Sequence, residues 1–382
     1  MASNFSSHVF YFAASRFFSA PSLFYGRLAK AIAMAFLAPL ICFYAINRLQ
    51  LSRAASAITA LMAVLLPGVV AFSWIATEYT LDLVFGFTAL VLFLSPNIIV
   101  KVLSGPALGL TALSYGEGLL FIPLMVAEYL LFLWKQPSPR AFSLIGTCVG
   151  FAAATLAIPG IWWRNSPMLF LGGGRIEFDI IGKNFRQLFQ ELSIQGGSYY
   201  YFSKYPALSC TTIIALCSIG FLLSIRQFNI RWPLYLGFFT ALGMYCVSGG
   251  AIGIRRNVFI VIIAVLFAGC FLDAWLRWAF FQTRNMGIRL AAIVLVLLCF
   301  ELPVKQYLLL RKSYESGEIR LPIDFKFERI PGMTMVQTID FLKDHPDVLS
   351  KSAQAYELDR TLSILYFKDI SKLTLLLPKE FR

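Results

Sequence analysis

The chain has 382 residues, of which 58% are hydrophobic, 15% aromatic and only 14% charged. Soluble domains carry about 25% charged residues, so the composition excludes an ordinary soluble protein. The only two histidines, His8 and His345, leave almost no material for a histidine-rich metal site or a serine–histidine triad. The seven cysteines all lie in apolar runs without a C-x-x-C pair, so we expect them to pack as small hydrophobic residues.

The net charge of +13 is concentrated in the first 310 residues, which hold 21 basic and nine acidic side chains. The remaining 72 residues hold 12 basic and 11 acidic ones and are nearly neutral. Lysines and arginines that flank membrane helices face anionic lipid headgroups. The charge therefore predicts membrane lipid, and not nucleic acid, as a partner of the chain.

In chain order, residues 1–27 are rich in aromatic side chains and are expected to lie in the membrane interface. Residues 28–310 follow as a transmembrane domain, interrupted by a loop at 162–206. This domain holds ten apolar segments of roughly the length that crosses a bilayer: Leu28–Ile46, Ala54–Trp74, Tyr79–Ser95, Asn97–Ser114, Gly118–Trp134, Ala141–Ile161, Ala207–Ile225, Trp232–Gly249, Asn257–Trp275 and Ile288–Lys305. The segments predict an all-α polytopic protein with about ten transmembrane helices, integral to the plasma (inner) membrane.

Residues 311–382 have a mixed, soluble composition, with one stretch of helical spacing and two strand-like runs. We expect a small C-terminal appendage of mixed structure on the non-cytoplasmic side of the membrane. At 72 residues it has room for only a modest core.

Alternation of ten helices assigns the connections between them to two membrane faces. One face receives the connections at 47–53, 96–101, 135–140, 226–231 and 277–289, each of which has at least one basic residue. The short turns of the other face, at 77–80 and 115–118, have none. The positive-inside rule then places the first group of connections in the cytoplasm. Most acidic side chains of the domain fall on the opposite, outer face, where we expect any chemistry to occur.

Two of these outer acids, Glu78 and Asp82, lie four residues apart where a short outer loop enters a helix. This spacing puts both carboxylates on one side of the first turn. Either they stabilise the helix start through the helix dipole, or Glu78 faces an outer cavity and binds a hydroxyl or a cation while Asp82 orients it. A divalent cation is accordingly a candidate cofactor, although no residues are assigned as metal ligands.

A third outer acid, Glu117, stands between Gly116 and Gly118, which let the chain turn sharply and approach a ligand closely. A plain turn with a solvated acid is the alternative. Glu128 falls inside a predicted span and must face protein or water, because a charged side chain in lipid is costly. We expect a structural partner for Glu128.

The loop at 162–206 combines aromatic residues with Arg164 and Arg175, and a second basic pair, Arg255 and Arg256, begins a later helix on the same face. Arginines supply the charge and the donors that hold a phosphate. The four arginines are candidate phosphate ligands, with interface anchoring as the alternative.

Three stretches from Arg27 to Arg164 resemble the polyprenyl-phosphate-dependent GT-C glycosyltransferases, which include dolichyl-phosphate-mannose mannosyltransferases and aminoarabinose transferases. A helix from Arg53 runs to Leu66-Pro67-Gly68, an acid at Glu78 precedes an apolar helix, and Gly105-x-x-x-Gly109-Leu110 leads to Glu117-Gly118. The order and the sidedness of these stretches agree with that family.

The resemblance implies transfer of a sugar from a polyprenyl-phosphate donor to an envelope, lipid or protein acceptor on the non-cytoplasmic face. Glu78, Asp82 and Glu117 would be the catalytic group, and Arg164, Arg175, Arg255 and Arg256 would bind the lipid phosphate. The chain departs from the family in having no counterpart of its first helix and first-loop acid, and in Tyr115 before the Glu-Gly pair. A non-catalytic transporter or polysaccharide-assembly partner is the alternative function.

Overall fold

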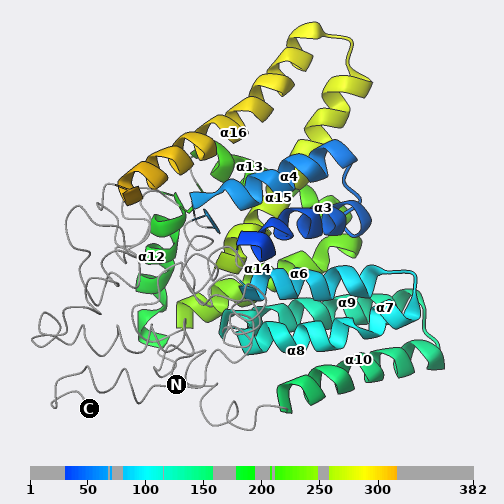
Figure 1. Ribbon diagram of the computed structural model, residues 1–382. Helices are drawn as coiled ribbons and strands as arrows, with labels where there is room; N and C mark the ends of the chain where they lie inside the picture. The colour runs from blue at the N-terminus through cyan, green and yellow to red at the C-terminus, as the bar shows by residue number, and fades with distance from the viewer. Residues whose placement is uncertain are drawn as a thin grey trace, which may run out of the picture.

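A computed structural model describes residues 31–67, 69–70, 81–114, 116–157, 178–193, 207–208, 211–247 and 258–315. Within these ranges the chain is almost entirely helical and has no strand (Figure 1). The predicted interfacial segment at 1–27 lies outside the described residues, as does the predicted appendage at 311–382 except for residues 311–315, which the structure places in the last turns of a helix and not in a separate appendage. The all-α expectation for the membrane domain is confirmed.

The first two described helices, α3 (Leu37–Asn47) and α4 (Arg53–Leu65), form a hairpin. The link between them contains Gln50 at a φ of 58°, and Ser52 begins α4 by accepting a hydrogen bond from the Ala55 amide at 3.4 Å. α4 ends at Leu65 because Leu66 is extended before Pro67. The Leu-Pro pair therefore ends α4 inside the predicted span Ala54–Trp74, at the position suggested by the resemblance to the GT-C helix.

α6 (Leu81–Leu94) is followed by α7 (Ile98–Val102) and α8 (Ser104–Ser114). The sequence predicts one span over Asn97–Ser114, whereas the structure has a turn at Leu103 between two helices. α8 packs against α6 on one side and α10 (Pro139–Ala157) on the other. A Cβ at Gly105 would lie 2.2 Å from the Cys148 carbonyl oxygen of α10, so the Gly-x-x-x-Gly pattern serves close helix packing.

A short 3₁₀ turn, η1 (Gly116–Leu120), leads into α9 (Phe121–Lys135). Phe121 fills the space above Gly86 of α6, where an added Cβ would lie 2.5 Å from the ring. Its ring also meets Phe87 edge-on at 5.6 Å. These contacts bring the start of α9 against α6.

α13 (Thr211–Ser224) and α14 (Phe228–Val247) are joined by a tight 3₁₀ turn, η3 (Ile225–Gln227), where the sequence predicts an open connection at 226–231. In a straight helix Phe221 and Tyr235 would be about 21 Å apart. Their ring centroids are 4.8 Å apart, and the Tyr235 hydroxyl donates to the Phe221 carbonyl oxygen at 2.5 Å. The chain therefore bends sharply at η3, and aromatic side chains of the two helices meet across the bend.

α15 (Val258–Arg277) is the most buried helix of the described bundle and packs against α13, α4 and α14. It continues into a π-helical turn, η5 (Trp278–Gln282), and α16 (Met286–Glu315) then runs along the edge of the bundle with few contacts, mainly to α4 and η5 (Figure 1). A further helix, α12 (Ile181–Ser193), lies in the loop at 162–206 after the short turn η2 (Phe178–Ile180) and contacts α14.

Each of the ten apolar segments predicted as a span contains a helix in the structure. Among the described residues, five helical stretches are long and apolar enough to cross a membrane: Gly118–Lys135, Pro139–Ala157, Thr211–Val247, Val258–Gln282 and Met286–Leu309. The third of these comprises α13, η3 and α14. The remaining apolar helices are shorter, at 10–17 residues. This helix content indicates an integral membrane protein.

Candidate functional site

One predicted catalytic carboxylate, that of Asp82, is well placed in the structure. Asp82 is the second residue of α6, and its side chain is 0% exposed. Leu94, at the other end of α6, lines a pocket beside Arg48. Twelve residues of helix separate Asp82 from Leu94, or about 18 Å. Asp82 therefore lies at the end of the bundle opposite the Arg48–Ser52 link, as the predicted topology requires.

Glu117 belongs to η1, which contacts α6, α8, α9 and α14 at this same end of the bundle. Gly118 is required there by packing, because its Cβ position is 2.1 Å from the Thr111 carbonyl oxygen of α8. Gly118, for which the sequence suggested close approach to a ligand, thus allows η1 to pack closely against α8. The structure brings η1 and the helix that carries Asp82 together.

α12 covers part of the same end. The Asn184 side-chain amide donates to the Cys246 carbonyl oxygen at 3.0 Å, and the Tyr245 hydroxyl donates to Glu191 at 3.2 Å. Gln187 donates to the other oxygen of Glu191 at 2.9 Å. Glu191 therefore attaches α12 to the last turn of α14.

The other predicted site residues are Glu78, Arg164, Arg175, Arg255 and Arg256, and all five lie outside the described residues. In the part of the chain that is described, no group of three or more His, Cys, Asp or Glu side chains is close enough to hold a metal ion.

At the opposite end, the structure shows a polar cluster that the sequence analysis did not find. Glu128 of α9 accepts hydrogen bonds from the Tyr44 hydroxyl at 3.0 Å and from Arg48 Nε at 2.5 Å. The side chains of Arg48 and Glu128 are 6% and 4% exposed. The expectation of a structural partner for Glu128 is confirmed. The partner is Arg48, and the two side chains form a buried ion pair.

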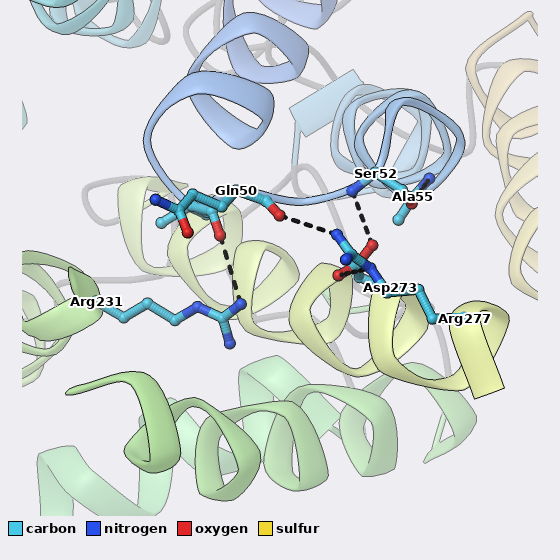
Figure 2. Close-up of polar contacts among 7 residues, drawn as sticks. Gln50, Ser52, Ala55, Arg231, Asp273 and Arg277 are labelled. Atoms are coloured by element: carbon cyan, nitrogen blue, oxygen red, sulfur yellow. Dashed lines mark hydrogen bonds and ion pairs between the residues drawn. The ribbon is translucent and has the colours of Figure 1, made fainter. Parts of the chain in front are cut away.

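The Arg48–Ser52 link is held from α14 and α15 as well (Figure 2). Arg231 donates to the Leu49 carbonyl oxygen at 3.4 Å, and Arg277 donates to that of Gln50 at 3.2 Å. Asp273 accepts from the Ser52 amide at 2.8 Å and pairs with Arg277 at 2.9 Å. Side chains from three later helices thus fix one short connection.

Most residues of this cluster come from the helix ends that the sequence assigns to one membrane face, whereas Glu128 comes from the middle of α9. Two acids of the cluster stand out in the sequence: Glu128, which falls inside an apolar segment, and Asp273, the one acid near a set of otherwise basic connections. The pairs themselves were not predictable, because Arg48 is separated from Glu128 by 80 residues and Ser52 from Asp273 by 221. The grouping agrees with the predicted alternation of the helices.

Comparisons of the chain with protein-family models, with curated proteins and with solved structures found no match.

Proposed function

We propose that the chain is a multi-pass membrane glycosyltransferase that moves a sugar from a polyprenyl-phosphate donor to an acceptor of the cell envelope on the non-cytoplasmic face. The observation that carries the proposal is the burial of the Asp82 carboxylate in the first turn of α6, the helix that η1 contacts. A carboxylate removed from water within a membrane domain is costly and is a candidate for function. The order of the GT-C-like stretches in the sequence adds to it.

Glu78, four residues before Asp82, is the proposed general base. It takes the proton of an acceptor hydroxyl while that oxygen attacks the anomeric carbon. The bond from this carbon to the donor oxygen breaks, and polyprenyl phosphate leaves with the electron pair. Asp82 and Glu117 orient the base and the acceptor.

Arg164, Arg175, Arg255 and Arg256 are the proposed ligands of the donor phosphate, since guanidinium groups match phosphate oxygens in charge and geometry. The proposed topology has ten crossings of the plasma membrane, with these arginines and the three carboxylates on the outer side. Helices shorter than about 20 residues cross a bilayer core by local thinning or by snorkelling of flanking residues.

The test is sugar transfer by the purified full chain in lipid nanodiscs, with polyprenyl-phosphate donors that carry a hexose or a pentose. Release of polyprenyl phosphate is measured for the unaltered chain, for Glu78→Gln and for Asp82→Asn. We expect Glu78→Gln to lower kcat by about 100-fold or more, the range of general base catalysis. Asp82→Asn is expected to lower it less, since Asp82 acts through Glu78.

Glu301→Gln is the matched control, because Glu301 is an exposed acid on α16. It should leave transfer unchanged. Folded protein with no transfer from any of these donors would contradict the proposal and leave the non-catalytic transporter or assembly partner. Unchanged transfer in Glu78→Gln would remove Glu78 from the mechanism.

A further inference from the structure

A pocket of about 170 Å³ opens beside the polar cluster, at the end of the bundle away from Asp82. It lies among the ends of α3, α6, α7 and α9 and the start of α14. The residues that give it its character are Arg48, Lys101, Lys135, Glu128, Phe93 and Phe132. None of them belongs to the proposed transfer site.

The pocket is positively charged. Three cationic side chains and one carboxylate line it. Both oxygens of that carboxylate, Glu128, are already engaged by Tyr44 and Arg48. Lys101 and Lys135 therefore present charge that no carboxylate in the pocket neutralises, and the pocket favours an anion.

Arg48 supplies the second observation. Its side chain is 6% exposed and lines the pocket, yet no described residue is a hydrogen-bond partner of its buried Nη2. Buried donors almost always have a partner, and leaving one unpaired is costly, the more so for a charged group. An acceptor from outside the chain would remove this cost.

Lys101 is held in place for such an acceptor. Its Nζ donates to the Phe93 carbonyl oxygen at 2.6 Å and lies 5.1 Å and 5.3 Å from the ring centroids of Phe93 and Phe132. An ammonium group has three N–H donors. Two of them remain for a ligand, while the rings fix the position of the charge.

The size and surroundings of the pocket limit the ligand. Pockets for drug-sized ligands measure about 300–1,000 Å³, so this one admits a phosphate group but not a nucleotide sugar. Large apolar side chains are exposed near the two lysines in the sequence. Ile98 and Ile99 precede Lys101 on α7, and Trp134 precedes Lys135 on α9. Basic pockets between membrane helices bind the headgroups of anionic lipids.

From these observations we infer that the pocket is a phosphate-binding site, built by Arg48, Lys101 and Lys135, that takes the headgroup of an anionic membrane lipid. The site binds the headgroup without a chemical reaction, and the bound phosphate links the ends of α3, α7 and α9. The site shares no residue with the proposed transfer site, so either can fail without the other.

The experiment follows thermal unfolding of the full chain in neutral detergent during titration with phosphatidylglycerol, with phosphatidylcholine, and with sodium phosphate against sodium chloride of equal ionic strength. We expect phosphatidylglycerol to raise the unfolding midpoint and phosphatidylcholine to leave it unchanged. Lys101→Gln/Lys135→Gln should bind phosphatidylglycerol about thirtyfold more weakly, since each lysine near an anionic surface contributes about 1 kcal/mol.

Arg140→Gln is the matched control, because Arg140 is an exposed cation of α10 at a connection assigned to the same face and does not line the pocket. It should behave as the unaltered chain. If the double variant does not fold, Lys135→Gln alone removes one exposed lysine and is expected to weaken binding about fivefold.

A rise with sodium phosphate alone, lost in the double variant, would support the pocket and identify its source of phosphate as soluble. Equal stabilisation of the double variant and the unaltered chain would overturn the inference, as would an equal loss in Arg140→Gln. Absence of any effect of phosphatidylglycerol and of phosphate would overturn it as well.

Discussion

At the level of individual residues, the ion pair between Arg48 and Glu128 has the clearest consequence for the free energy of unfolding. Both groups are buried, and Tyr44 donates to the same carboxylate. Taking two charges out of water costs several kcal/mol per ion, which the pair and its hydrogen bonds must offset. Removing one partner therefore costs more than the pair contributes, because the other charge stays buried.

Glu128→Gln is expected to lower the free energy of unfolding by about 3 kcal/mol, because it leaves the Arg48 guanidinium without its counter-charge. The measurement is equilibrium unfolding of the purified chain in detergent. Arg48→Met/Glu128→Leu, which removes both charges, should regain most of the loss. A double variant as unstable as Glu128→Gln would show that packing, and not the buried charge, is what the substitution disturbs.

The Asp273–Arg277 pair should behave differently, since Arg277 is 53% exposed and water screens its charge. Asp273→Asn keeps an oxygen for the Ser52 amide and is expected to cost less than about 1 kcal/mol. The same unfolding assay ranks the two variants. A loss in Asp273→Asn as large as that in Glu128→Gln would contradict the difference in burial on which the ranking rests.

The sequence predicted the surroundings of some of these residues, but it did not predict which residues they contact. Glu128 had to face protein because its segment is apolar, and the structure agrees. Arg48 was predicted only to be one of several cytoplasmic cations, because a contact between residues far apart in the chain leaves no local pattern in the sequence. The burial of Asp82 was likewise beyond prediction, because its spacing from Glu78 fits a solvated helix start equally well.

Between helices, glycine decides how closely the described elements approach. A Cβ at Gly220 of α13 would lie 1.8 Å from the Phe267 carbonyl oxygen of α15, and one at Gly269 of α15 would lie 2.4 Å from the Thr59 hydroxyl of α4. Small residues at such contacts let membrane helices gain packing contacts that lipid cannot replace. α15 is central to the bundle because its neighbours can come this close.

Gly220→Ala is expected to lower the free energy of unfolding by about 2 kcal/mol, because the added methyl group meets backbone that cannot move aside cheaply. Gly146→Ala is the matched control, since Gly146 of α10 has no atom within 4 Å of its Cβ position. The control should be neutral or slightly stabilising, because alanine has the higher helix propensity. Equal losses in the two variants would show that α13 and α15 are not in close contact.

The helices themselves were well predicted, because long apolar runs leave few alternatives to a helix in a membrane. Their interruptions were not. The turn at Leu103 lies just before Gly105-Pro106, and Pro106 has no N–H to continue the helical hydrogen bonds, so this interruption could have been predicted. The 3₁₀ connection at Ile225–Gln227 has no proline or glycine that would mark it, and packing, such as the contact of Phe221 with Tyr235, determines where the chain bends there.

For the molecule as a whole, we propose that the two ends of the helix bundle face opposite sides of the membrane. The Arg48–Ser52 link, Lys101 and Lys135 gather at one end, and Asp82, η1 and α12 lie towards the other. Both the proposed sugar transfer on the outer side and the assignment of the basic connections to the cytoplasm depend on this arrangement.

The most direct test is labelling of single cysteines with a membrane-impermeant thiol reagent in intact cells, in a chain whose native cysteines are replaced by serine or alanine. Lys183→Cys, on the exposed side of α12, should react in intact cells. Gln136→Cys, in the exposed connection after α9, should react only once the membrane is permeabilised. Labelling of Gln136→Cys in intact cells, or of both positions only after permeabilisation, would contradict the arrangement.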